Sequence, residues 1–359
     1  MKPDSMKLNN IQALRAIAAL MVVFAHIDLP RYQSVGIHPD MFAFGAFGVD
    51  VFFVISGFIM MYIGAGKSGL RDAGGFLERR FLRVWPLYAF FTAVAVWLAY
   101  ESDPNWWLSY YYPRAKMDPA WIAGSLTFTR WSRSPVDAIG WTLIYEFWFY
   151  VSVSIMIALR AGPKYFFLGY TVLILAVRAL GLAKSPMLNQ FTHPFMLEFV
   201  YGVVVYELFA GGRLGYSNGK ALALAAAAAV TTVLAWRTLD SPALYSRVLF
   251  SGSAGFFIVA LALTLEHRFT AGKALVLLGD ASYSIYLTHW TVLTTLPSLL
   301  DLHHLSNMGP ITYIAVNVAA ALLLSFAVFF LIEKPLRLAA QCIHRRFRRA
   351  KGAPAPATP

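Results

Sequence analysis

Ten apolar segments constrain what this chain can fold into more than any other feature. Each is roughly 17 to 22 residues long, and about 20 predominantly apolar residues are enough to carry a helix across a bilayer. The segments lie at residues 11–29, 44–64, 84–100, 141–159, 165–182, 191–209, 220–237, 247–265, 283–300 and 311–332. Gly, Pro and polar residues interrupt the second, sixth and ninth. The pattern predicts an all-α bundle of about ten transmembrane helices.

The composition excludes a soluble globular protein. Of the 359 residues, 58% are hydrophobic and only 13% are charged, and the mean hydropathy is +0.59. Too little polar surface would remain to face water if such a chain were soluble. The net charge of +12 is therefore interpreted through its position relative to the membrane, not as a sign of nucleic-acid binding. The single cysteine, Cys342, excludes an internal disulfide and a multi-cysteine zinc site.

The distribution of Lys and Arg predicts the orientation of the helices. If the N-terminus is cytoplasmic, most of the 30 Lys and Arg residues fall in cytoplasmic segments, as the positive-inside rule requires. An even number of helices then also places the basic C-terminal tail in the cytoplasm. Residues 1–337 are expected to form one membrane domain. Residues 338–359 are expected to form a disordered, basic, Pro- and Ala-rich tail on anionic lipid. The first helix is expected to be retained, not cleaved as a signal peptide.

The first apolar segment carries two ionisable residues, Arg15 and His26. Eleven residues complete three helical turns plus roughly 20°, so both side chains project from one face, about 16 Å apart along the axis. The small residues Ala18, Ala19 and Val22 lie between them on that face. One reading is a narrow passage with a cation at its inner end and an imidazole farther out. Alternatively, Arg15 reaches the lipid headgroups and His26 makes an interhelical hydrogen bond.

Two further stretches place charged residues in or beside apolar segments. The stretch "FGVDVFFVISGF" holds Asp50, which either orients the tautomer of His26 or caps the second helix. The stretch "LERRFLRVWPLY" places Arg79, Arg80 and Arg83 directly before the third predicted helix. These arginines either anchor that helix on the cytoplasmic side or bind the phosphate groups of a cofactor through bidentate hydrogen bonds.

Two polar stretches lie in the fourth and ninth segments. The stretch "WTLIYEFWFYVS" holds Glu146 among aromatic residues, and an ionisable residue inside a membrane indicates a functional site. Tyr145 and Tyr150 are its candidate partners. The stretch "LGDASYSIYLTHW" contains Ser282, Tyr283, Tyr286 and His289. The last three are successively three residues apart, so neighbours share a helical face. They form either a direct part of a catalytic site or a polar network between helices.

Taken in order, these stretches resemble the membrane acyltransferase family 3. The features are the Arg-x10-His first helix, "FGVDVFFVISGF", "RRFLRVWP", "WTLIYEFWFY", "SYSIYLTHW" and the closing "IEKPLR". They cover residues 8–337, and the whole series in the family's order is far more specific than any one motif. The opening "NNIQALRAIAALMVVFAHI" is most similar to the exopolysaccharide acetyltransferases of the family, the ExoZ-like group.

The resemblance implies a helical bundle with both ends cytoplasmic and an O-acyltransferase activity. Members of the family transfer an acyl group, usually acetyl from acetyl-CoA, to a hydroxyl of a sugar or another acceptor. For this chain we expect transfer from cytoplasmic acetyl-CoA to a sugar hydroxyl of an exopolysaccharide, lipopolysaccharide or lipid-linked glycan. The expected location is the bacterial cytoplasmic (inner) membrane. No metal and no nucleic acid are expected as partners.

The residues and the resemblance together predict roles for individual side chains. The expected catalytic residues are His26, Asp50 and Glu146, which should converge on one cavity in the outer half of the membrane. His26 would take a proton from the acceptor hydroxyl or accept the acetyl group covalently. The expected acetyl-CoA-binding residues are Arg15, Arg79, Arg80 and Arg83. The expected supporting residues are Tyr145, Tyr283, Tyr286 and His289.

One position departs from the family pattern, and one other function competes with acyl transfer. Many relatives carry a second acidic residue after the fourth-helix glutamate, whereas Phe147 follows Glu146 here, which argues against a role that needs paired carboxylates. The alternative function is a proton-coupled membrane transporter, which would also use ionisable residues in the membrane. A transporter predicts a paired inverted repeat, which the sequence does not show, and it does not need cytoplasmic arginines that bind phosphate.

Overall fold

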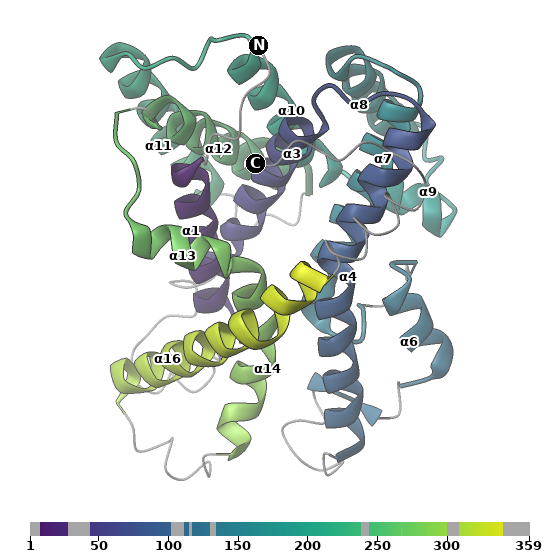
Figure 1. Ribbon diagram of the computed structural model, residues 1–359, viewed down its shortest axis with the longest axis vertical. Helices are drawn as coiled ribbons and strands as arrows, with labels where there is room; N and C mark the ends of the chain where they lie inside the picture. Colours follow the sequence, from purple (N-terminus) through teal and green to yellow (C-terminus); the bar gives the residue numbers. More distant parts are fainter. Residues whose placement is uncertain are drawn as a thin grey trace.

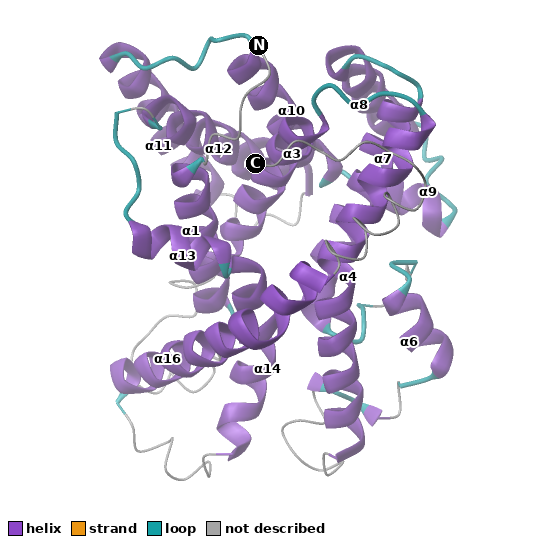
Figure 2. Cartoon of the chain, viewed as in Figure 1, coloured by secondary structure: helices purple, strands orange, loops and turns teal. Residues whose placement is uncertain are grey.

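The structure is a computed structural model and describes residues 8–27, 44–101, 111–114, 117–129, 134–237, 244–266, 268–299 and 309–339. Across these residues the regular secondary structure is helical throughout, and they contain no strand (Figure 2). The all-α prediction is therefore confirmed for this part of the chain. The predicted C-terminal tail falls almost entirely outside the described residues.

The helices follow one another along the chain with short connections. Their bounds are α1 Asn9–Ala25, η2 Phe44–Ala46, α3 Phe47–Gly64, α4 Leu70–Glu101, α6 Pro119–Leu126, η4 Ala138–Gly140, α7 Trp141–Ala158, α8 Pro163–Ala179, α9 Pro186–Phe191, α10 Met196–Ala210, α11 Asn218–Arg237, α12 Leu244–Leu265, α13 Lys273–Asp280, α14 Ser282–Leu299, α16 Pro310–Val328 and η5 Phe329–Glu333. The last of these is a single π-helical turn that extends α16.

Within the described residues, 7 helical segments are long and apolar enough to cross a membrane. They are Phe44–Gly64, Leu70–Glu101, Ala138–Ala158, Pro186–Ala210, Asn218–Arg237, Leu244–Leu265 and Ile311–Ala339. Helix α1 is also apolar but has only 17 residues. The protein is thus an integral membrane protein. All ten predicted segments coincide with helices, while ten complete spans and cytoplasmic termini stay predictions.

The third predicted helix begins earlier than the sequence suggested. Helix α4 starts at Leu70 instead of residue 84 and runs for 32 residues, so Arg79, Arg80 and Arg83 lie inside it and not before it. Leu, Glu and Arg are good helix formers, and the stretch from Phe76 to Trp85 contains no Gly or Pro that would break a helix. The arginines are consequently held on a rigid helix that continues into the apolar part of the bundle.

Helix α1 is packed closely among four other helices, α3, α12, α13 and α14. A Cβ atom on Gly48 of α3 would overlap the carbonyl oxygen of Ala18, and one on Gly279 of α13 would overlap that of Gln12. Small residues at such crossings let two helix backbones approach closely. In Figure 1, α4 is the long helix on the right, and α16 crosses the lower half of the view toward it. This arrangement surrounds the cavity described next.

Candidate active site

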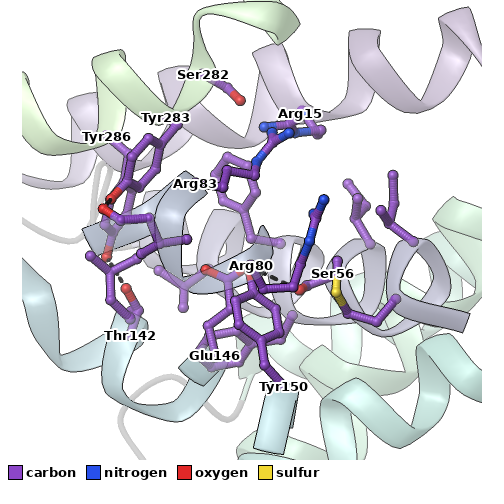
Figure 3. Close-up of a pocket in the computed structure, with 18 of the residues that line it drawn as sticks. Arg15, Ser56, Arg80, Arg83, Thr142, Glu146, Tyr150, Ser282, Tyr283 and Tyr286 are labelled. Carbon is purple, nitrogen blue, oxygen red and sulfur yellow. Dashed lines mark hydrogen bonds between the residues drawn. The ribbon is translucent and has the colours of Figure 1, made fainter. Parts of the chain in front are cut away.

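A cavity of about 220 Å³ lies between α1, α3, α4, α7 and α14. Its polar lining consists of Gln12, Arg15, Ser56, Arg80, Arg83, Thr142, Glu146, Tyr150, Asp280, Ser282, Tyr283, Tyr286 and Arg337. Its apolar lining consists of Val49, Phe52, Phe53, Ile55, Ile59, Met60, Val84 and Leu143. Figure 3 shows Arg15, Arg80 and Arg83 extending from their helices into this space.

The charges that line the cavity are not balanced. Four arginines, Arg15, Arg80, Arg83 and Arg337, face two carboxylates, Glu146 and Asp280, among the described lining residues. Like charges gathered between membrane helices repel one another strongly, because little water is present to screen them. An anion bound between them would relieve this repulsion, and guanidinium groups match phosphate oxygens in bidentate geometry. The cavity is therefore suited to a phosphorylated ligand.

Glu146 is held in the cavity wall by two hydroxyl groups. Ser56 Oγ on α3 donates to Glu146 Oε1 at 3.0 Å, and Tyr150 Oη, one turn along α7, donates to the same oxygen at 2.5 Å. These hydrogen bonds fix the carboxylate beside Arg80, which lines the same wall (Figure 3). Of the predicted catalytic residues, Glu146 is the one that the structure places on the cavity. Its predicted partner Tyr150 is confirmed as a contact.

Helix α14 contributes the row of hydroxyls that the sequence singled out. Tyr283 Oη donates to the Val84 carbonyl at 2.6 Å, and Tyr286 Oη lies 2.7 Å from Thr142 Oγ1, so both rings tie α14 to neighbouring helices. Ser282 is only 1% exposed, and its hydroxyl has no hydrogen-bond partner among the described residues. A buried donor without a partner is costly, so Ser282 is available to bind a ligand in the cavity.

Two of the predicted site residues lie elsewhere. Arg79 is absent from the described lining, because it is about 100° around α4 from Arg80. Tyr145 packs into an aromatic cluster, with its ring centroid 5.9 Å from Trp141 and 4.8 Å from His193. Neither side chain faces the cavity in this structure, and their predicted functional roles stay predictions.

His26 lies beyond the cavity wall and in contact with His289. Its Nδ1 atom is 2.8 Å from the Val22 carbonyl oxygen and 3.3 Å from His289 Nε2. Tyr286 lines the cavity, and its ring centroid lies 5.7 Å from that of His289. Tyr286 thus separates the arginine-lined cavity from the histidine pair. The predicted contact between His26 and a carboxylate is replaced by a contact with a second imidazole.

The residues between Arg15 and His26 do not line an open passage. Ala18, Ala19 and Val22 are at most 1% exposed and belong to the packed core, and they are not among the described residues that line the cavity. The expectation that these small side chains leave room for a ligand arm is therefore wrong. Their size instead serves the close approach of α3 to α1. The ends of the face stay accessible at Arg15, which lines the cavity.

Asp50 is paired with a residue that the sequence analysis did not consider. Arg247 of α12 donates from Nε to Asp50 Oδ1 and from Nη2 to Oδ2, both at 3.1 Å. Asp50 is 1% exposed, and the buried carboxyl of Glu198 lies beside it. The predicted convergence of His26, Asp50 and Glu146 on one cavity is thus not found, because Arg247 competes successfully for Asp50. The predicted catalytic roles of these residues stay predictions.

Three residues of these clusters were missed by sequence reasoning. Arg337 lies in the closing motif "IEKPLR", which carried a signal without an assigned role. Arg247 sits in a predicted apolar segment, where any charged residue indicates a buried partner. Glu198 gave the same signal in the sixth segment. Across the described residues, no group of three or more His, Cys, Asp or Glu side chains could hold a metal ion.

A cavity with excess positive charge, enclosed by membrane helices and adjoined by a histidine pair, is a setting for chemistry on an anionic substrate. The family model that matches this chain agrees with that class. It describes an acyltransferase domain and matches residues 8–330, so the chain belongs to this acyltransferase family. The predicted family and the prediction of an acyltransferase are both confirmed. The protein is a membrane acyltransferase.

Two relatives place the chain more closely within the family. It is 30% identical over 307 residues to the exopolysaccharide production protein ExoZ of Rhizobium meliloti (strain 1021), which covers 82% of this chain and 90% of that protein. It is 26% identical over 333 residues to the acyltransferase MdmB of Streptomyces mycarofaciens, which covers 82% of this chain and 81% of that protein. No solved structure matches the chain.

Proposed function

We propose that this protein transfers an acetyl group from cytoplasmic acetyl-CoA to a sugar hydroxyl of an exopolysaccharide, lipopolysaccharide or lipid-linked glycan. The proposed location is the bacterial inner membrane. The observation that carries the proposal is the imbalance of four arginines over two carboxylates around the cavity. The similarity to a protein named for exopolysaccharide production supports a glycan acceptor.

The cavity has the two kinds of surface that a CoA thioester needs. Arg15, Arg80, Arg83 and Arg337 offer guanidinium groups to phosphates. Its apolar wall, which includes Phe52 and Met60, suits the pantetheine arm. Glu146, bonded to Ser56 and Tyr150, would hold Arg80 in place and not touch the thioester itself. In this proposal Glu146 is a positioning residue of the donor site.

His26 is the proposed catalytic residue. Its imidazole would take the proton of the acceptor hydroxyl while the hydroxyl oxygen forms a bond to the thioester carbonyl carbon. The carbon–sulfur bond then breaks, and the proton passes from His26 to the CoA thiolate. A covalent acetyl-His26 intermediate is the second route that the same position allows. For either route the thioester must pass Tyr286, which stands between the cavity and the histidine pair.

The test is transfer of radioactivity from acetyl-CoA labelled in its acetyl group. The purified protein is reconstituted in lipid vesicles together with a glycan extract of the host membrane. We expect the label to appear in an alkali-labile ester on the glycan, and His26→Ala to abolish the transfer while the protein still binds acetyl-CoA. A proton-coupled transporter would leave all label on acetyl-CoA. That result in the wild-type protein, with every likely host glycan fraction supplied, would refute the proposal.

A further inference from the structure

Two histidines that are 263 residues apart in the sequence meet in the bundle. His26 lies at the end of α1, and His289 lies on α14. Their ring centroids are 5.1 Å apart with an interplanar angle of 54°, and the ring of Trp290 stands edge-on to His26 at 5.4 Å. His289 is 0% exposed, whereas His26 is partly exposed. Only His26 can therefore touch a substrate.

The backbone determines which nitrogen of His289 carries its proton. His289 Nδ1 lies 3.1 Å from the Ile285 carbonyl oxygen, one helical turn earlier. A carbonyl oxygen only accepts hydrogen bonds, so Nδ1 must be the donor. In the neutral ring the other nitrogen, Nε2, then carries a lone pair. That lone pair faces His26 Nδ1 at 3.3 Å.

The same argument applies to His26. Its Nδ1 lies 2.8 Å from the Val22 carbonyl oxygen, so this nitrogen also carries the hydrogen. The hydrogen is then shared between the Val22 carbonyl and the lone pair on His289 Nε2. In the opposite pair of tautomers, both Nδ1 lone pairs would face carbonyl oxygens, which is repulsive. One arrangement alone satisfies all three contacts, and it leaves the lone pair of His26 on Nε2.

We infer that His289 is a positioning residue for His26: it accepts a hydrogen bond from His26 Nδ1 and thereby directs the basic Nε2 atom toward the acceptor hydroxyl. The inference rests on the proposed function of His26. When Nε2 takes the hydroxyl proton, His26 becomes an imidazolium, and its Nδ1–H bond to His289 strengthens because the donor is now charged. When Nε2 returns the proton to the CoA thiolate, the original tautomers are restored.

A second imidazole suits this position better than a carboxylate would. A carboxylate at 0% exposure needs a paired cation, because burying an isolated charge is costly. A neutral imidazole accepts the same hydrogen bond without that cost. This explains how His26 can be oriented although Asp50 is committed to Arg247.

The first test reads the tautomers directly. Full-length protein labelled with ¹⁵N-histidine is placed in lipid nanodiscs, and nitrogen chemical shifts distinguish protonated from unprotonated ring nitrogens. Signals of the two residues are assigned by their loss in His26→Gln and His289→Gln. We expect a proton on Nδ1 and none on Nε2 for both rings. A proton on Nε2 of His26 in the resting protein would overturn the inference. The measurement needs no turnover, so its outcome is independent of the proposed function.

The second test is kinetic. His289→Phe keeps a buried ring but removes the acceptor, and we expect kcat for acetyl transfer to fall about 10- to 100-fold, the usual effect of a lost hydrogen bond to a charged group. The KM for acetyl-CoA should stay within about twofold, because the arginines are untouched. His289→Gln supplies an amide oxygen and should recover much of kcat.

The control is His193→Phe, since His193 stacks on Tyr145 in a separate aromatic cluster; its kcat should be unchanged. A lower melting temperature of His289→Phe with normal kcat would show a purely structural contact and overturn the inference. Equal losses in His289→Phe and His289→Gln would also overturn it. If the wild-type protein transfers no acetyl group at all, the proposed function fails, and the tautomer measurement still stands on its own.

Discussion

Two clusters of ionisable side chains lie in the same helical bundle and differ in how their charges are matched. Around Asp50, a bidentate pair with Arg247 joins α3 to α12, and both carboxylate oxygens are satisfied. Around the cavity, four arginines from α1, α4 and the end of α16 outnumber the two carboxylates. The first cluster is closed and paired, whereas the second is hollow and carries excess charge.

The difference separates residues that hold the fold from residues that await a ligand. A buried ion pair is stable only with good geometry, and removing one partner leaves an uncompensated charge in the bundle. A cluster with excess charge is strained without its counter-ion, and the ligand supplies that counter-ion. Loss of a residue from the first cluster should therefore reduce stability, and loss of a residue from the second should reduce binding. The following substitutions test this division.

The largest effect is expected for Arg247→Ala. It leaves the buried Asp50 beside Glu198 without a cation, and breaking a buried pair typically costs about 3–5 kcal/mol. The melting temperature in detergent should fall strongly. The neutral double variant Asp50→Asn with Arg247→Gln should recover most of the loss, because no charge is left unpaired. A melting temperature of Arg247→Ala equal to that of the wild type would contradict a structural role for this pair.

The next effect concerns Arg80 and Arg83. Arg80→Ala and Arg83→Ala each remove a charged donor to phosphate, a contact worth about 1.5–3 kcal/mol, so the KM for acetyl-CoA should rise about 10- to 100-fold. Lysine should restore only part of the affinity, since a point charge cannot replace a planar fork. The melting temperature should not fall, because repulsion within the cavity decreases.

Arg79 provides the matched control for these two variants. It lies on the same helix but is not among the described lining residues, so Arg79→Ala should change the KM for acetyl-CoA by less than about twofold. If the acceptor KM rose as much as the acetyl-CoA KM in Arg80→Ala or Arg83→Ala, the arginines would not form a donor site.

A smaller effect is expected for Arg337→Ala. Arg337 lines the cavity but is partly exposed, and solvent reduces the strength of its ionic contacts to about 1 kcal/mol. The KM for acetyl-CoA should rise several-fold, with kcat unchanged. Lys334→Ala is the control, since Lys334 is exposed in the same motif and points over the Phe330 ring. Equal effects of both substitutions would indicate a general charge effect near the membrane surface.

The smallest effect, and the most discriminating in sign, is expected for Ser282→Ala. The substitution removes a buried hydroxyl without a partner among the described residues, so the ligand-free protein should become slightly more stable, by about 0.5–1 kcal/mol. Acetyl-CoA binding should weaken by a few-fold. Ser284→Ala should do the opposite, because Ser284 Oγ donates to Glu333 at 2.6 Å and holds α14 to η5. A destabilised Ser282→Ala would show that its hydroxyl has a structural role.

Much of the site could be predicted from the sequence, and the failures share one cause. Arg15, Arg80, Arg83, Glu146, Tyr283 and Tyr286 were selected as polar residues in apolar segments, and all six line the cavity. The position of each residue on its own helix follows from local periodicity. The partner of each residue does not, because it depends on how helices pack. Asp50 was assigned to His26 since both lie toward the same end of neighbouring helices, whereas the structure gives Asp50 to Arg247.

The sequence by itself determined the helices, their apolar character and the family, since hydropathy and motif order are properties of the chain read locally. The tertiary structure alone decided the pairings, because each joins segments far apart in the chain. Asp50 and Arg247 are 197 residues apart, and His26 and His289 are 263 apart. Such contacts are selected by close helix packing at small residues such as Gly48. Inside a membrane a buried polar group must find a partner wherever that packing brings one.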